Sequence, residues 1–138
     1  MRPHAGSGMT VVQLPGALNA LGSRIIGAAI AVHRELGPGL LEGIYETCLT
    51  KELDLAGLRW QRQVVLPIHY KGQRLDSALR LDLLVEDAVV LEVKAVETLL
   101  PVHEAQLLTY LRLTAKRLGY ILNFNVPVMR QCIRRIAH

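Results

Sequence analysis

The pattern of hydrophobic and polar positions first has the period of a helix. Apolar residues from Leu18 to Leu36 recur every three or four positions, which predicts one stripe of an amphipathic helix. The Gly-Pro-Gly sequence at 37–39 ends this helix. A second helix is predicted from about Leu41 to Ala56, with Gly57 at its C-terminus. We expect the second helix to bury Leu41, Ile44, Cys48, Leu49 and Leu53.

The middle of the chain changes to the alternation of apolar and polar residues that is typical of strands. Strands are predicted at Trp60–Tyr70, Leu75–Val85 and Val89–Val96, then a helix from Leu100 to about Lys116, a strand at Gly119–Asn125 and a last edge strand at Cys132–Ile136. This α-α-β-β-β-α-β(-β) order predicts an α/β sandwich, with a central mixed β-sheet flanked by helices.

Composition places few further limits on the protein. A length of 138 residues fits one domain, predicted at 18–138, after a flexible N-terminal tail at 1–17 that is rich in glycine and proline. No apolar run is long enough for a membrane span, so no membrane partner is expected. Two cysteines make no disulfide framework, which favours a cytoplasmic location. A net charge of +4 suits a polyanionic partner.

The segment 80–94 is predicted to be a β-hairpin whose register can be worked out from its side chains. If residues 86–88 form a three-residue loop, Val85 pairs with Val89 and Asp82 lies opposite Glu92. A two-residue loop would send the two carboxylates to opposite faces of the sheet. Only the odd-length loop keeps each face chemically uniform, so we expect Asp82 and Glu92 to be neighbours.

Neighbouring carboxylates repel each other, because paired positions on adjacent strands bring Cβ atoms to about 5 Å. A cation between Asp82 and Glu92 would remove that cost, and a hard divalent ion such as Mg²⁺ or Mn²⁺ takes oxygen ligands of this kind. The alternative is a charged sheet face that is simply solvated. The presence of Lys94 beside the two acids, in an otherwise apolar hairpin, favours the metal site.

The sequence Asp82, then Glu92-x-Lys94 on the next strand, resembles the catalytic signature of the PD-(D/E)xK nuclease superfamily. The proline that names the superfamily is replaced here by Leu81, a position that only shapes the strand before the aspartate.

A second motif, Gly39-x-x-Glu42-x-x-Tyr45, resembles the GxxExxY protein family, which is placed in the same superfamily. The similarity runs from about Ile25 to Arg135 and implies a restriction-endonuclease-like fold.

The resemblance implies a role for each residue of the signature. Glu42 becomes a further metal ligand with Asp82 and Glu92, the carbonyl of Val93 another, and Lys94 positions or activates the attacking water. Simpler interpretations stay open. Glu42 could be an exposed first-turn glutamate favoured by the helix dipole, and Lys94 could form a plain ion pair with Glu92. Tyr45 could be a packed aromatic residue whose hydroxyl is satisfied.

The third predicted helix carries His103, Gln106 and Tyr110 on one face. The spacing Gln106-x-x-x-Tyr110 resembles the helical motif of the RecB-type branch of the superfamily. The resemblance implies that Gln106 holds the reacting water or a phosphate and that Tyr110 supports nucleic acid. For His103, an ordinary helix-start histidine is the stronger interpretation.

Basic residues are scattered over the rest of the sequence, and they are candidates for phosphate contacts or for an ordinary solvated surface. The candidates are Lys71, Arg74, Arg80, Arg130, Arg134 and Arg135.

The sequence therefore predicts a metal-dependent nuclease that hydrolyses phosphodiester bonds in DNA or RNA. The alternative is a non-catalytic nucleic-acid-binding or oligomeric interaction module on the same fold. A metal-dependent enzyme acting on a nucleotide or another phosphoester is a weaker third hypothesis, since no glycine loop of the phosphate-cradling type is present. A homodimer, a partner protein or the shape of the substrate would have to supply specificity.

Overall fold

The structure is a computed structural model that describes residues 13–138, with every side chain in that range except those at 131 and 132. Its helices are α1 (Gly16–Leu36), α2 (Glu42–Leu55) and α3 (Pro101–Thr114). The predicted tail lies outside the described residues as far as residue 12, and α1 begins at Gly16 instead of Leu18. Within the described range, no helix combines the length and the apolar character needed to cross a membrane.

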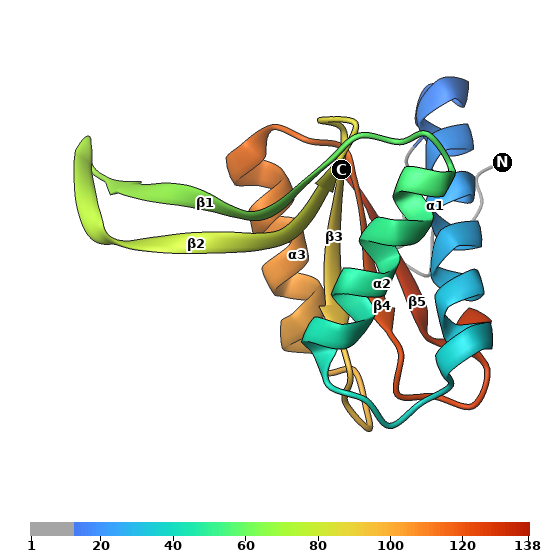
Figure 1. Cartoon of the computed structure of the whole chain (residues 1–138). Coiled ribbons are helices and arrows are strands. Elements are labelled where there is room, and N and C mark those ends of the chain that lie inside the picture. The colour runs from blue at the N-terminus through green and yellow to red at the C-terminus, as the bar shows by residue number, and fades with distance from the viewer. Residues whose placement is uncertain (1–12) are drawn as a thin grey trace, which may run out of the picture.

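The five strands form one mixed sheet in the order β1-β2-β3-β4-β5 (Figure 1). They are β1 (Trp60–Tyr70), β2 (Gln73–Val85), β3 (Val89–Lys94), β4 (Leu118–Asn123) and β5 (Ile133–Ala137). Strands β3 and β4 are parallel and are joined through α3, and the other neighbouring pairs are antiparallel. The predicted α/β architecture with a central mixed sheet is confirmed.

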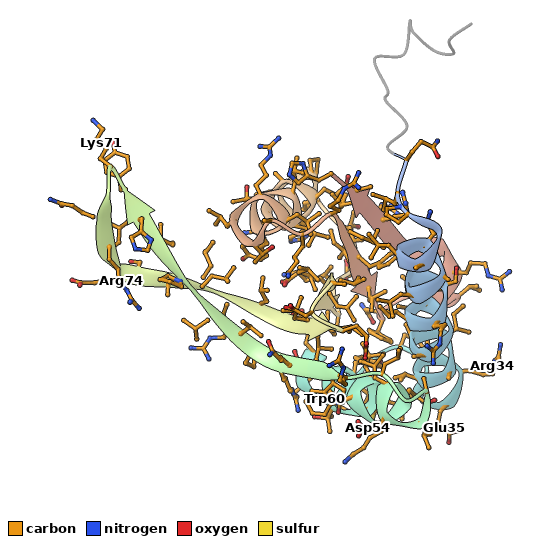
Figure 2. All side chains as sticks on the ribbon, turned by 90° about the horizontal axis from the view of Figure 1, so that it is seen from above. Arg34, Glu35, Asp54, Trp60, Lys71 and Arg74 are labelled. Atoms are coloured by element: carbon orange, nitrogen blue, oxygen red, sulfur yellow. The ribbon has the colours of Figure 1, made fainter. Side chains whose placement is uncertain are left out.

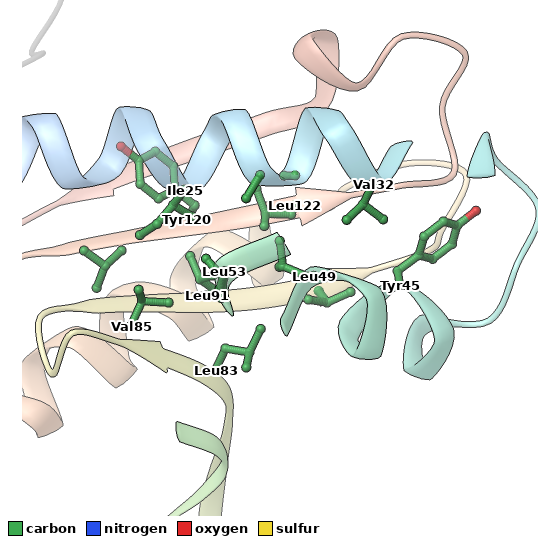
Figure 3. Packing of buried hydrophobic residues seen from close by; sticks show 14 of the residues in the cluster. Ile25, Val32, Tyr45, Leu49, Leu53, Leu83, Val85, Leu91, Tyr120 and Leu122 are labelled. Atoms are coloured by element: carbon green, nitrogen blue, oxygen red, sulfur yellow. The ribbon is translucent and has the colours of Figure 1, made fainter. Parts of the chain in front are cut away.

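Helices cover both faces of the sheet and divide the core into two clusters. Helices α1 and α2 pack on one face, where Ile25, Leu49, Leu91 and Leu122 are fully buried (Figure 3). Helix α3 packs on the other face, over the smaller cluster of Leu81, Leu84, Val90, Leu107, Leu111 and Ile121. The alternation predicted along the hairpin is confirmed where β2 and β3 pair, because Leu83 and Leu84 enter different clusters.

Several predictions about local structure were wrong: β3 and β4 each end two residues earlier than expected, and Cys48 is only partly buried. Leu41 and Ile44 were expected to be buried, but 77% and 43% of their surfaces are exposed. Helix α2 turns a different stripe inward because Tyr45 stacks on the buried ring of Phe124, with the two centroids 4.6 Å apart. The last strand begins at Ile133 instead of Cys132, after a short 3₁₀ turn at Met129–Cys132.

Strands β1 and β2 continue well beyond the rest of the sheet. We call residues 64–81 the arm. Figures 1 and 2 show the arm as a twisted two-stranded ribbon that leaves the body of the protein and ends at a turn beside Lys71. Its pairing is regular from Val64–Leu81 to Pro67–Ala78, and a bulge near Pro67 shifts the register before the turn.

Candidate functional site

The loop between β2 and β3 sets the position of the two central carboxylates. Residues 86–88 form the connection, and Glu86 and Asp87 adopt left-handed backbone angles with φ near 52° and 51°. Val85 pairs with Val89 and Leu83 pairs with Leu91, which is the register of a three-residue loop. Continued by one residue, this register brings Asp82 level with Glu92.

Each of these two carboxylates accepts a hydrogen bond from the backbone of the other strand. The Asp82 N–H donates to Glu92 Oε2 at 3.3 Å, and the Val93 N–H donates to Asp82 Oδ2 at 2.8 Å. The strand pairs of β2 and β3 extend only as far as Leu83–Leu91. The side chains therefore satisfy backbone groups just where β2 leaves β3, which brings the two acids together.

The environment of the pair disfavours two negative charges. Glu92 is only 8% exposed, and burial together with the charge of Asp82 raises its pKa to about 8. Burial also raises the pKa of Asp82, while the hydrogen bond from Val93 opposes that rise. The positive charge of Lys94, the last residue of β3, lowers the pKa of both acids. A bound cation would act in the same direction.

Glu42 reaches the same end of β3 from α2. It is the first residue of that helix, and its Oε2 accepts a hydrogen bond from the Ala95 N–H at 3.1 Å. Its negative charge makes a small contribution to raising the pKa of Asp82. The structure thus brings Glu42 to the residue that follows Lys94.

The Gly39-x-x-Glu42-x-x-Tyr45 sequence has a clear mechanical role in this arrangement. Gly39 has a φ of 104°, in the region that favours glycine. The Tyr45 hydroxyl donates to the Gly37 carbonyl at 2.5 Å and accepts from the Leu40 N–H at 3.1 Å. The glycine makes the turn, the tyrosine fastens the turn to α2, and Glu42 joins α2 to the end of β3. Tyr45 is itself fully buried, as a packed aromatic residue would be.

Glu46 is a residue of this region that sequence reasoning missed. It is 6% exposed, forms an ion pair with Arg62, and accepts hydrogen bonds from Gln63 Nε2 at 3.2 and 3.1 Å on its two oxygens. Its charge contributes to the raised pKa of Asp82 and of Glu92. The Glu42-x-x-x-Glu46 spacing is the signal that could have found it, since residues four apart share a helix face.

Asn123 was also missed, and it holds the chain beyond Lys94 in place. The two residues are level in the parallel β3–β4 ladder, and Asn123 is fully buried. Its amide accepts from the Val96 N–H at 3.0 Å and donates to the Val96 carbonyl at 2.9 Å. An asparagine between Leu122 and Phe124, inside the apolar run of a predicted strand, is the sequence signal for this role.

Helix α3 contributes Tyr110 to the surroundings of the carboxylates. Burial and then the charges of Glu92 and Asp82 raise the pKa of its phenol. Gln106 lies one turn earlier on the same helix and is exposed. His103 caps the helix, because its Nδ1 accepts a hydrogen bond from the Leu100 N–H at 3.0 Å.

The predicted phosphate contacts are spread over different parts of the molecule. Lys71 and Arg74 lie at the tip of the arm (Figure 2). Arg80 is exposed at the base of the arm. Two of the C-terminal arginines have partners in the body of the protein: Arg134 lies 3.7 Å from Glu104, and Arg135 donates to Asn19 at 3.0 Å.

The donor set of the carboxylate pair suits a hard cation, although it is small. Among the side chains that the structure describes, no three of His, Cys, Asp or Glu are gathered in a metal-binding arrangement. Two adjacent carboxylates are nevertheless enough protein ligands for Mg²⁺, because this ion keeps several water ligands and commonly binds one or two carboxylates. The raised pKa of the buried Glu92 supports this fit, since proximity to Asp82 is costly without a compensating charge.

Comparison with known protein families agrees with the topology of the chain. Residues 19–136 match the family model described as PD-(D/E)XK nuclease superfamily. No significant match to a curated protein or to a solved structure was found. The matched region includes β1 to β4, nearly all of β5 and most of α1, so the chain belongs to the PD-(D/E)XK nuclease superfamily.

Proposed function

We propose that the protein is a metal-dependent nuclease that hydrolyses phosphodiester bonds in DNA or RNA. The observation that carries this proposal is the adjacent pair of half-buried Asp82 and buried Glu92, each bonded to the other's strand, with Lys94 close enough to lower the pKa of both. Membership of the nuclease superfamily supports it.

Asp82 and Glu92 are the proposed metal ligands, with the Val93 carbonyl and Glu42 as further candidates. Glu42 already accepts a hydrogen bond from the Ala95 N–H on Oε2, so Oε1 is the oxygen that would be offered to the metal. When bound, Mg²⁺ or Mn²⁺ would acidify a water molecule and neutralise charge on the phosphate.

Lys94 is the proposed catalytic residue of the chain. Its ammonium group would orient the attacking water or stabilise the negative charge that develops on the phosphoryl oxygens. Gln106 is the proposed second contact to the water or a phosphate, and Tyr110 would support the nucleic acid beside the carboxylates. We also propose that the chain falls within the GxxExxY family, because Gly39, Glu42 and Tyr45 act together at this site.

A non-catalytic binding module on the same fold is the second candidate. One observation favours it: Asp82, Glu92 and Glu42 each accept a hydrogen bond from a backbone N–H, as purely structural carboxylates would. The module would retain affinity for nucleic acid and would not cut it.

A cleavage screen decides between the two candidates. Single-stranded, duplex and branched DNA and RNA are incubated with Mg²⁺ or Mn²⁺ and with wild type, Lys94→Ala or the surface control Lys51→Ala. We expect Lys94→Ala to lower the cleavage rate by about 10²–10⁴-fold with little change in affinity, while Lys51→Ala behaves as wild type. Binding without cleavage of any substrate would support the binding module instead.

A further inference from the structure

The arm is the largest feature of the molecule that the proposed chemistry does not use. We call the place near Asp82 where β2 separates from β3 the fork. Beyond the fork, β1 and β2 continue as a two-stranded ribbon that extends past the helices (Figures 1 and 2). An isolated two-stranded ribbon is marginally stable in water. The arm also exposes apolar side chains, since Val65, Tyr70 and Leu75 are 51%, 63% and 42% exposed. A ribbon of this kind is suited to contact with a partner.

The charges of the arm indicate an anionic partner. Within residues 64–81, Lys71, Arg74 and Arg80 are cationic and Asp76 alone is acidic, which leaves an excess of two positive charges. All three cationic side chains are exposed. At the tip, the ammonium group of Lys71 lies over the exposed ring of Tyr70, 5.5 Å from its centroid. Charge is therefore present both at the tip and at the base.

We propose that the arm is a groove-binding element that enters the major groove of double-stranded DNA and holds the duplex against the carboxylate pair. This inference rests on the proposed nuclease function and names the form of its substrate. The major groove of B-DNA is about 12 Å wide and admits a two-stranded β-ribbon. At about 3.3 Å per residue, the ribbon from Arg80 to the turn at Gly72 extends roughly 26 Å, which is most of one turn of the duplex.

The base of the arm adjoins the proposed reaction site. Arg80 precedes Asp82 by two residues on β2, and Arg62, on β1 just before the arm, is paired with Glu46. A duplex that follows the arm toward the body must therefore pass Asp82 and Glu92. The arm would supply binding affinity along the groove, and the residues at the fork would hydrolyse the phosphodiester bond.

Single strands and duplex RNA fit these observations less well. Proteins that bind single strands without sequence preference use several aromatic platforms, whereas Tyr70 is the one aromatic side chain between residues 64 and 81 other than the imidazole of His69. The major groove of A-form RNA is deep and narrow, so protein elements do not enter it readily. Duplex DNA remains the partner that the ribbon and its charges match.

A second copy of the chain is a poorer partner for the arm. Strand β1 lies at the edge of the sheet, and Pro67 with the nearby bulge interrupts the row of backbone donors that another strand would need. Two arms would also bring like charges together. Both features are common means of preventing strands from pairing at an edge.

The test compares DNA affinity at the arm and at another exposed surface. Labelled duplex DNA, duplex RNA and single-stranded DNA of one sequence are titrated at several salt concentrations in EDTA, which prevents cleavage. We expect duplex DNA to bind most tightly. The double variant Lys71→Ala/Arg74→Ala should weaken duplex binding about tenfold and reduce the slope of log affinity against log salt by about 1.8, as for two lost phosphate contacts.

A charge-matched control completes the design. Arg34→Ala/Lys51→Ala removes two exposed cations from α1 and α2 and should leave affinity and salt slope unchanged. Equal losses in the two double variants would overturn the proposal, because the binding would then follow net charge alone. Tighter binding of RNA or of single strands would also overturn it. A third result would also overturn the proposal: the wild type is a dimer, the arm variant is a monomer, and the two bind DNA equally well. The arm would then serve to bind a second copy of the chain.

The outcome is separable from that of the nuclease proposal. If the arm variant loses affinity but the wild type cuts nothing with either metal, the groove-binding inference stands and the nuclease proposal fails. If the wild type cuts DNA and the arm variant binds as wild type, the nuclease proposal stands and the arm inference fails.

Discussion

The strands of the body and the strands of the arm belong to one sheet but differ in how much of their surface is buried. In the body, the first five residues of β3 and all six of β4 are buried between two layers of helices. On the arm, the same kind of alternating strand sequence leaves most side chains exposed. The difference shows that strand pattern alone does not decide burial: the body strands have helices to cover both faces, and the arm extends past them.

The proposed site lies where these two regions meet. Strand β2 belongs to both, and Asp82 stands at the position where it leaves β3. The ladder between these strands ends there, so backbone N–H groups become available to the carboxylates of Asp82 and Glu92. In an uninterrupted ladder these N–H groups would bond to carbonyls of the neighbouring strand. At the fork they bond to the two carboxylates instead, which brings the acidic side chains together.

The largest expected effect is on the body. Leu91 is fully buried in the main cluster, so Leu91→Ala removes apolar contacts and leaves a cavity. We expect a loss of about 2–5 kcal/mol in the free energy of unfolding, measured by urea denaturation. A loss below about 1 kcal/mol would show that β3 is less well packed than its burial implies.

The link between body and arm should give the next largest effect. Arg62→Ala leaves the buried carboxylate of Glu46 without its charged partner, and we expect a cost of about 3 kcal/mol. The double variant Arg62→Ala/Glu46→Gln, which removes the stranded charge, should recover part of that loss. The single variant Glu46→Gln completes the cycle. If the loss in the double variant equals the sum of the losses in Arg62→Ala and Glu46→Gln, the two residues are not coupled.

Glu92 should make the metal-free protein less stable as the pH rises. Its pKa is about 8 in the folded protein and near 4.5 in the unfolded chain, so the folded state holds the proton between these values. Stability from this group is complete below pH 4.5 and is lost as the pH rises through 8. At about 1.36 kcal/mol per pKa unit, the loss between pH 5 and pH 8 is on the order of 3 kcal/mol.

The measurement is the unfolding free energy in EDTA at a series of pH values. Glu92→Gln should flatten the dependence, because the amide stays neutral. The exposed control Glu97→Gln should keep the slope of wild type. A wild-type protein that gains stability over this range relative to Glu92→Gln would have the opposite sign and would contradict the raised pKa.

A divalent cation should stabilise the fork by mass action. At about 100 times its dissociation constant, Mg²⁺ or Mn²⁺ that binds only the folded protein adds about 2.7 kcal/mol, seen as a rise in the thermal midpoint. Asp82→Asn should abolish the rise, whereas Asp76→Asn on the arm should retain it. An equal rise in both variants would place the ion elsewhere.

The same contrast explains what could be predicted from the sequence. The body is governed by periodicity, so the element order followed from the sequence, and the β2–β3 register followed from the demand that each hairpin face be uniform. The side on which α2 packs did not follow, because Leu41 and Ile44 are as apolar as the residues that are buried. Only the stacking of Tyr45 on the distant Phe124 decides between the two sides.

The candidate site divides in a similar way. Asp82, Glu92 and Lys94 stand close together in sequence, and one hairpin was enough to predict their neighbourhood. Glu46 was hidden because its partners lie on β1, where Gln63 adopts a left-handed backbone with φ near 55°. No propensity predicts that conformation for glutamine in a strand, so the contact depends on tertiary structure alone.

The smallest expected effect lies on the arm and completes the comparison. Leu75→Ala makes the same chemical change as Leu91→Ala, but Leu75 is 42% exposed and stands near the tip of the ribbon. Truncation there should change the unfolding free energy by less than about 0.5 kcal/mol, because little area is removed from contact with the body. The two variants are measured side by side in urea. A loss at Leu75 approaching that at Leu91 would show that the arm is packed against something in solution, either a second copy or the body itself. A negligible loss would show that the arm contributes little to folding stability, so that its apolar and basic side chains can be altered in binding experiments without unfolding the protein.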